Sequence, residues 1–358
     1  MARNSRPKQQ RMDPSKTPVK GAVREPVKQS SKSKVAETPT FEKKKPVPRK
    51  RKGGRPGGRS PVPVAHKATL SDWVGGARVR TLSLAIVPVA LGTAAAHAAT
   101  GFDEWHWVRA LLCLAVALCL QIGVNFANDY SDGIRGTDSY RVGPSRLTGS
   151  GAAQPRVVLA VALFFFAVAA VAGVAVVVLS GHYWLLAVGA ACILAAWFYT
   201  GGKHPYGYYG LGEVFVFVFF GLVATTATTF VQVDTVNLES WLAGAAAGFL
   251  ACAVLMANNL RDLEQDTLAH KRTLSVLVGN LTSRILFTVF ALIPFVILAV
   301  FVLFYQNAYY VYFCLLLAVP AAVIVLTGKS PAEFLIALKL TSLTALLFGV
   351  GLALAIAF

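Results

Sequence analysis

Apolar runs recur along this chain from residue 80 to its C-terminus, and each is long enough to cross a bilayer, which takes about 20 mostly apolar residues in a helix. Of the 358 residues 55% are hydrophobic and only 14% are charged. Soluble chains usually carry about 25% charged residues. The composition excludes a soluble enzyme, a fibrous protein and a wholly disordered chain, and it predicts an all-α polytopic membrane protein.

Nine apolar runs predict nine transmembrane helices. They lie at 80–100, 107–127, 156–179, 183–200, 211–231, 240–259, 285–304, 308–327 and 336–357. Residues 70–77 (LSDWVGGA) come before the first run and predict a short interfacial helix, which Ser71 or Asp72 caps.

The chain divides into two parts of different charge. Residues 1–67 hold 20 Lys and Arg against 4 Asp and Glu, whereas residues 68–358 hold 14 against 13. The first part has few large apolar side chains and is predicted to be a disordered basic tail, and residues 68–358 are predicted to be the membrane-embedded domain. The tail either adsorbs to anionic lipid or is a solvated extension that fixes topology. Nucleic-acid binding is not expected, because stacking aromatic residues are scarce there.

The basic residues of the membrane domain predict its orientation. With the tail in the cytoplasm, 13 of the 14 Lys and Arg fall at cytoplasmic helix ends or loops, and only Arg109 falls on the other side. This pattern predicts a multi-pass protein of a bacterial cytoplasmic membrane with its N-terminus in the cytoplasm. The five cysteines lie in apolar runs without C-x-x-C spacing, so they are predicted to be buried and unpaired.

Two polar segments carry the acidic residues that suggest chemistry. In the first, Asn125, Asp129 and Asp132 share one face if the helix continues to Asp132, with Asn128 beside them. In the second, Asn258, Asp262 and Asp266 are spaced four residues apart, again on one face. Such residues at helix ends can simply cap or line a loop, and intramembrane acids can also carry ions in a transporter. Against a transporter, these acids gather at one surface and the other helices hold almost no charge.

Carboxylates at membrane depth are costly and need partners or ions. Oxygen ligands in this number suit Mg²⁺, which usually bridges to substrate phosphates. The surrounding basic residues supply charge for an anion such as a diphosphate. The combination predicts a substrate with a diphosphate head held by metal and an isoprenyl tail lying in the bilayer.

The two segments resemble the Asp-rich motifs of the UbiA superfamily of intramembrane aromatic prenyltransferases, and the resemblance spans roughly residues 70–358. Asn128, Asp129 and Asp132 match the motif N-D-x-x-D-x-x-x-D, except that its last position is Gly136 and the next acid is Asp138. Asp262 and Asp266 match D-x-x-x-D. Longer stretches at 128–151, 199–213 and 266–279 resemble the branch that prenylates 1,4-dihydroxy-2-naphthoate. His270 departs from that branch, which usually has Gly before Lys-Arg-Thr, and it either caps the loop or is catalytic.

The resemblance implies nine helices around a central cavity, capped on the cytoplasmic side by the loops 128–155 and 260–284. It implies transfer of a polyprenyl group from polyprenyl diphosphate to 1,4-dihydroxy-2-naphthoate, with loss of CO₂, to give demethylmenaquinone. The alternatives are another aromatic acceptor, such as 4-hydroxybenzoate, or an ion-coupled carrier.

Residue roles follow from the same resemblance. Asp129, Asp132, Asp262 and Asp266 are expected to bind Mg²⁺, and Asn125, Asn128 and Asn258 to contact the metal shell or the phosphates. The basic candidates for the leaving group are Arg80, Arg141, Arg146, Lys203, Lys271 and Arg272. Lys203 and Lys271 could instead only set topology. The allylic cation could lie against a ring of Tyr130, Tyr199, Tyr206, Tyr208 or Tyr209.

Overall fold

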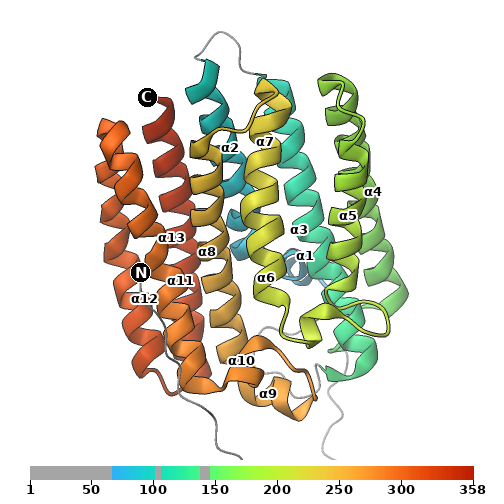
Figure 1. The fold of residues 1–358 in the computed structure, drawn as a ribbon. Helices are drawn as coiled ribbons and strands as arrows, with labels where there is room; N and C mark the ends of the chain where they lie inside the picture. Colours follow the sequence, from blue (N-terminus) through green and yellow to red (C-terminus); the bar gives the residue numbers. More distant parts are fainter. Residues whose placement is uncertain (1–66, 101–105, 138–145) are drawn as a thin grey trace, which may run out of the picture. The chain divides into compact units, whose positions relative to one another are not determined.

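The computed structural model describes residues 67–100, 106–137 and 146–358, which belong to one unit, Pro61–Phe358 (Figure 1). The described residues are helices joined by short connections, without strands. The predicted basic tail lies outside the described residues except for Lys67, as do Asp138 and Arg141.

Eight helical spans are long and apolar enough to cross a membrane within the described ranges. Six are single α-helices and two combine several helical elements. The single helices are α2 (Ser83–Thr100), α3 (Trp107–Arg135), α4 (Pro155–Ser180), α8 (Leu238–Arg261), α11 (Asn280–Phe304) and α13 (Pro331–Ala357). The composite spans are α6 (Gly212–Val216) with the π-helix η4 (Phe217–Val223) and α7 (Ala224–Val233), and the 3-10 helix η5 (Gln306–Cys314) with α12 (Leu315–Thr327).

The ninth predicted span, 183–200, is the apolar helix α5 (Leu185–Phe198), which has 14 residues. At 1.5 Å per residue, a helix of this length is shorter than the hydrocarbon core of about 30 Å. The sequence pattern gives the helix but overestimates its length, because hydropathy counts the turns at Tyr183 and Tyr199 as part of the run. Eight of the nine predicted spans are therefore confirmed within the described ranges, and the ninth is present as a shorter apolar helix.

Local side-chain chemistry sets where several helices begin and end. The interfacial helix α1 (Leu70–Ala77) is present, but its cap is Thr69, which forms a reciprocal capping box with Asp72. Ser330 and Glu333 form the same arrangement at the start of α13. At the other end of α3, Gly136 adopts a left-handed conformation with φ 73°, which glycine tolerates without steric cost, and the helix stops there.

The core is built on small residues that let helices approach closely, as is common in membrane bundles. Helix α2 packs against α7, α8 and α13, α8 packs against α11, and α3 packs against α4. At the α2–α13 contact, a Cβ on Gly349 would lie 2.4 Å from a methyl of Val87. All five cysteines are unpaired, as predicted, but only Cys252 and Cys314 are buried and the other three are half-buried. The C-terminal end of α3 lies at the same end of the bundle as the short helices α9 (Leu263–Leu268) and α10 (Leu274–Val278) (Figure 1).

Candidate active site

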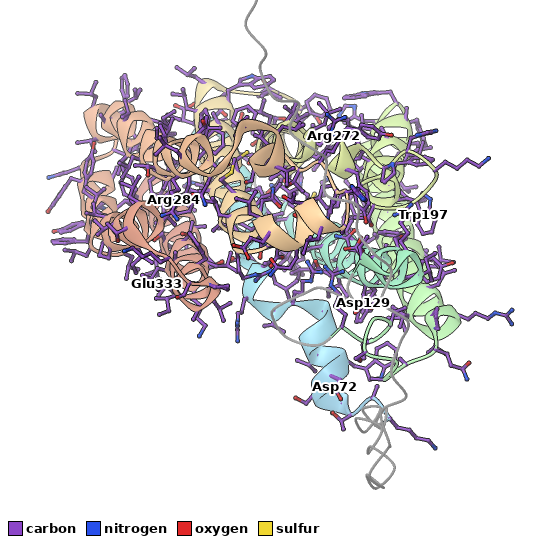
Figure 2. All side chains as sticks on the ribbon, turned by 90° about the horizontal axis from the view of Figure 1, so that it is seen from below. Asp72, Asp129, Trp197, Arg272, Arg284 and Glu333 are labelled. Carbon is purple, nitrogen blue, oxygen red and sulfur yellow. The ribbon has the colours of Figure 1, made fainter. Side chains whose placement is uncertain are left out.

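The first polar segment forms the last turns of α3, which continues beyond Asp132 as the one-face interpretation requires. Asn125, Asn128, Asp129 and Asp132 are all buried, between 2% and 6% exposed. The Asn125 amide donates to the carbonyl of Ala77 at 2.9 Å, and Asn128 accepts a 2.6 Å hydrogen bond from the Thr200 hydroxyl. The segment therefore fixes the end of α1 and the connection after α5. Figure 2 looks onto this end of the bundle, with Asp129 labelled.

Asp129 is bound to the backbone of a later turn. Its two carboxylate oxygens accept the N–H groups of Leu147 and Thr148 at 2.9 and 2.8 Å. Leu147 is itself buried in a core cluster with Phe126, and Thr148 lies against Gly133, where a Cβ would come within 2.3 Å of its methyl. The carboxylate thus holds the turn that begins at Arg146 against α3.

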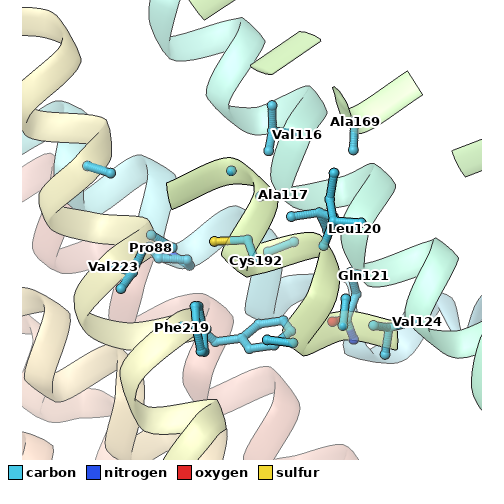
Figure 3. A pocket seen from close by; sticks show the side chains of 18 of the residues that line it. Pro88, Val116, Ala117, Leu120, Gln121, Val124, Ala169, Cys192, Phe219 and Val223 are labelled. Atoms are coloured by element: carbon cyan, nitrogen blue, oxygen red, sulfur yellow. The ribbon is translucent and has the colours of Figure 1, made fainter. Parts of the chain in front are cut away.

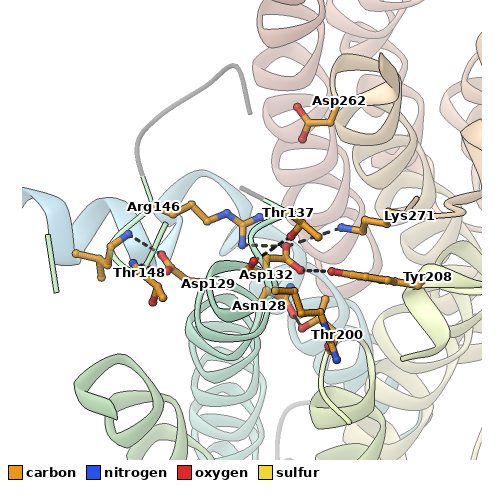
Figure 4. Close-up of polar contacts among 12 residues, drawn as sticks. Asn128, Asp129, Asp132, Thr137, Arg146, Thr148, Thr200, Tyr208, Asp262 and Lys271 are labelled. Carbon is orange, nitrogen blue, oxygen red and sulfur yellow. Dashed lines mark hydrogen bonds and ion pairs between the residues drawn. The ribbon is translucent and has the colours of Figure 1, made fainter. Parts of the chain in front are cut away.

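Asp132 brings together three distant segments (Figure 4). Its carboxylate lies 3.2 Å from Nη1 of Arg146 and 3.8 Å from Nζ of Lys271, and it accepts a 2.6 Å hydrogen bond from the Tyr208 hydroxyl. Two cations around one buried carboxylate leave positive charge at this point, which favours an anionic ligand.

Tyr208 lies within this cluster of charges. Burial, and then the neighbouring Asp132 carboxylate, hold the pKa of the Tyr208 phenol above its usual range, so the hydroxyl remains a donor. Its ring lies 5.0 Å from Nζ of Lys271 and 5.3 Å from the Arg135 guanidinium carbon. The ring therefore contacts protein cations rather than facing the apolar cavity.

The second polar segment does not continue as one helix. Helix α8 ends at Arg261, Asp262 adopts a non-helical conformation, and α9 begins at Leu263, so Asp262 and Asp266 do not share the face of a single helix. Asp262 accepts two hydrogen bonds from the Arg261 guanidinium, at 2.7 and 2.6 Å. The Asp266 carboxylate accepts a 3.5 Å hydrogen bond from the Thr273 hydroxyl, and its carbonyl accepts the Lys271 N–H at 2.8 Å. This fold-back brings Lys271 to Asp132.

The remaining predicted residues differ in position. Lys203, Arg80 and Arg272 have exposed side chains, and Lys203 has no hydrogen bond or ion pair with another described residue. His270 has φ 55°, the left-handed conformation that glycine favours, which agrees with its interpretation as a loop residue.

A mostly apolar cavity of about 470 Å³ adjoins the first segment (Figure 3). Its lining includes all three predicted asparagines, Asn125, Asn128 and Asn258, and the predicted Tyr199. The aspartates of the two motifs are not part of the lining. The asparagines thus stand between the charged cluster and an apolar chamber formed by α2–α8.

Four residues at or beside the site were not predicted as site residues: Thr200, Arg135, Arg78 and Glu213. Arg135 donates to the carbonyls of Thr200 and Gly202, and Arg78 lines the cavity. Glu213 accepts a 2.8 Å hydrogen bond from Asn259 and is buried. These contacts link residues far apart in sequence. The sequence signal for Thr200 and Glu213 is the polar stretch 199–213 between two apolar runs.

The side chains fit a hard divalent cation by their chemistry. Among the described residues, no three Asp, Glu, His or Cys side chains group closely enough to hold a metal ion on their own. Mg²⁺ is usually bound by one or two carboxylates together with waters and substrate phosphates. Buried carboxylates on two segments, with amide oxygens nearby and an anion-attracting surround, match that mode of binding.

Residues 85–333 match the UbiA prenyltransferase family. The chain belongs to this family. The resemblance drawn from the motifs is thereby confirmed.

Relatives of this family cover most of the chain. It is 47% identical over 296 residues to 1,4-dihydroxy-2-naphthoate octaprenyltransferase of Mycobacterium tuberculosis, covering 81% of this chain and 98% of that protein. It is 36% identical over 252 residues to the Escherichia coli protein of the same name, covering 69% and 81%. The fold is similar to a solved UbiA homologue from Archaeoglobus fulgidus bound to GPP and Mg²⁺, with a TM-score of 0.55 and 14% identity over 79% of this chain and 99% of that one.

Proposed function

We propose that this protein transfers a polyprenyl group from polyprenyl diphosphate to 1,4-dihydroxy-2-naphthoate, with loss of the ring carboxylate as CO₂, to give demethylmenaquinol, the reduced form of demethylmenaquinone. The observation that carries the proposal is the charged cluster around Asp132 at the edge of an apolar cavity. Such a site suits a molecule with an anionic head and a long apolar tail. The name of the Mycobacterium tuberculosis relative, at 47% identity, supports the naphthoate acceptor.

The head of the substrate is proposed to lie at Asp132, where Arg146 and Lys271 are within 4 Å of its carboxylate. Both cations sit on long side chains that can turn from Asp132 to a phosphate. Their positive charge stabilises the negative charge that builds up on the leaving diphosphate as the allylic C–O bond breaks. Lys203, Arg80, Arg141 and Arg272 remain candidates to contact the diphosphate from outside this cluster.

Mg²⁺ is proposed to bind through Asp132, Asp262 and Asp266, with Asn128 and Asn258 near the phosphates. When bound, the ion supplies a Lewis acid that polarises the diphosphate. Asp129 is assigned another task, because both of its oxygens accept backbone N–H groups of the turn that carries Arg146. The described partners of the Asp132 and Asp262 carboxylates are instead side chains, which can turn away when a metal ion binds.

The apolar cavity is proposed to hold the start of the prenyl chain and to exclude water from the allylic cation. Tyr199 and Tyr206 line this cavity, whereas Tyr130, Tyr208 and Tyr209 do not. The first two are therefore proposed to face the cation. A ring carbon of the acceptor then forms a C–C bond to the allylic carbon, and the C–CO₂⁻ bond breaks to restore the aromatic ring.

The test is a membrane assay with labelled polyprenyl diphosphate and 1,4-dihydroxy-2-naphthoate, run with and without Mg²⁺. Wild type is expected to form demethylmenaquinol only with Mg²⁺, and Asp132→Asn is expected to lower the rate at least about 100-fold. Asp234→Asn is the matched control. Asp234 lies in the loop between α7 and α8, is exposed, and pairs with His182 from the connection between α4 and α5. If product forms with 4-hydroxybenzoate but not with 1,4-dihydroxy-2-naphthoate, the proposed acceptor is wrong. No diphosphate release with any aromatic acceptor would favour an ion-coupled carrier.

A further inference from the structure

Four aromatic rings form a continuous row along one wall of the cavity. Tyr199 and Tyr206 have ring centroids 5.5 Å apart, Tyr206 stacks on Phe215 at 3.9 Å, and Phe215 stacks on Phe219 at 5.9 Å. All four side chains belong to the lining of the cavity. The row thus forms a surface of the chamber.

The row begins at the charged cluster. Tyr199 precedes Thr200, whose hydroxyl donates to Asn128. The Tyr206 hydroxyl donates to the carbonyl of Ala195 at 2.8 Å, which fixes the second ring. At the far end, Phe219 lies among the apolar side chains of Pro88, Cys192 and Val223 (Figure 3). The row therefore leads from the proposed place of the diphosphate into the apolar interior.

The π-helix η4 sets the position of the last ring. π-helical turns are rare and often occur at functional sites. On the side of η4 that faces α8, Gly221 is in such close contact that a Cβ would lie 2.5 Å from Cα of Gly248. Phe217 also packs on that side, against Gly248 and Phe249. With one side held against α8, η4 presents Phe219 and Phe220 to the cavity.

The facing wall is mostly aliphatic. From α3 it includes Val116, Ala117, Leu120 and Val124, with the polar Gln121 among them (Figure 3). A chain of isoprene units has a flat double bond and a methyl branch at each repeat. These groups match a wall of ring faces on one side and of branched aliphatic side chains on the other. The spacing of the rings is comparable to the length of one isoprene unit.

We infer that this row of rings is a register for the prenyl chain and determines selectivity for its length. Tyr199 and Tyr206 contact the unit next to the diphosphate, and Phe219 contacts a unit beyond the second. The inference rests on the proposed function and adds to it the residues that distinguish short from long donors.

The test compares Phe219→Leu with Phe217→Leu in the full-length protein. The KM is measured for dimethylallyl, geranyl and geranylgeranyl diphosphate, which have one, two and four units, at saturating naphthoate acceptor. Phe219→Leu is expected to raise the KM for the four-unit donor roughly three- to tenfold and to leave that for the one-unit donor within about twofold. Phe217→Leu, which alters the same helix outside the cavity, is expected to leave the ratio of the two KM values unchanged.

An equal change for all three donors in Phe219→Leu would overturn the register. A higher KM for the acceptor with unchanged donor KM values would also overturn it, since the row would then bind the acceptor ring. Equilibrium binding of the three diphosphates without acceptor separates this inference from the proposed function. If wild type does not prenylate the naphthoate, loss of length selectivity in binding by Phe219→Leu still supports the register, and unchanged selectivity overturns it.

Discussion

Asp129 fits the first motif, and both of its carboxylate oxygens accept backbone N–H groups, so we predict that it positions the turn that carries Arg146. A carboxylate that accepts two backbone N–H groups is replaced poorly by an amide, whose NH₂ group would face a donor. Asp129→Asn is expected to loosen the turn that carries Arg146 and to raise the KM for the diphosphate roughly tenfold, as expected for losing one hydrogen bond to a buried charge. The affinity of Asp129→Asn for Mn²⁺, measured by electron paramagnetic resonance, should differ from that of wild type much less than the affinity of Asp132→Asn does. Equal loss of metal binding in both variants would contradict this role.

Tyr208 makes a second prediction at the residue scale. Because burial and the Asp132 carboxylate raise the pKa of its phenol, the neutral donor form persists through the pH range of an activity assay. Wild type should therefore show no loss of activity due to Tyr208 ionisation up to pH of about 10, the ordinary phenol value. Tyr208→Phe should lower kcat/KM at every pH without changing the shape of the profile. An alkaline limb present in wild type and absent from Tyr208→Phe would contradict the raised pKa.

The sequence predicted the two acidic motifs and the buried face of α3 but not the contacts that make them a site. Residue spacing shows neighbours within one helix, so it placed Asn125, Asp129 and Asp132 together. Thr200 and Tyr208 reach the same helix from residues 72 and 76 positions away. Such long-range contacts depend on how the helices pack, which spacing within one segment does not encode.

At the scale of helices, arginines join the ends of neighbouring elements. The Arg109 guanidinium, at the start of α3, donates to the carbonyls of Val231 at 2.8 Å and Leu179 at 2.6 Å, in the last turns of α7 and α4. Arg284 on α11 donates to Val325, Leu326 and Gly328 at the end of α12. A positive charge at a helix C-terminus satisfies carbonyls that have no partner within the helix and interacts favourably with the helix dipole. This explains Arg109, the one basic residue that departs from the charge asymmetry.

Arg109→Met is expected to lower the free energy of unfolding by roughly 2 kcal/mol, since two hydrogen bonds from a charged donor are lost. The readout is the Tm in detergent, with enzymatic activity at low temperature as the check that the fold is retained. Arg156→Met is the matched control, because the Arg156 side chain is exposed. A similar fall in Tm for both variants would argue against a specific link between α3, α4 and α7.

Hydropathy located the helices well and their ends less well. Eight spans agree with the predicted runs, because the length of an apolar run is a direct requirement of the bilayer. The π-helix at Phe217–Val223 left no hydropathy signal, because the residues of that run are all apolar or glycine. The polar segment after residue 259 marks the end of an apolar run but does not show that the helix itself breaks at Asp262. Both affect the site, one by turning the second motif out of α8 and the other by positioning Phe219.

For the whole molecule, the unevenly placed basic residues predict that the charged cluster faces the cytoplasm. Lys203, in the connection after α5, and Thr235, between α7 and α8, are both exposed and separated by one span. An impermeant maleimide is expected to label Thr235→Cys in intact cells and Lys203→Cys only after the cells are made permeable. The unmodified chain is the control, because its five cysteines lie in apolar helical segments. Labelling of Lys203→Cys in intact cells, with Thr235→Cys protected, would reverse the orientation and place diphosphate binding on the outer face.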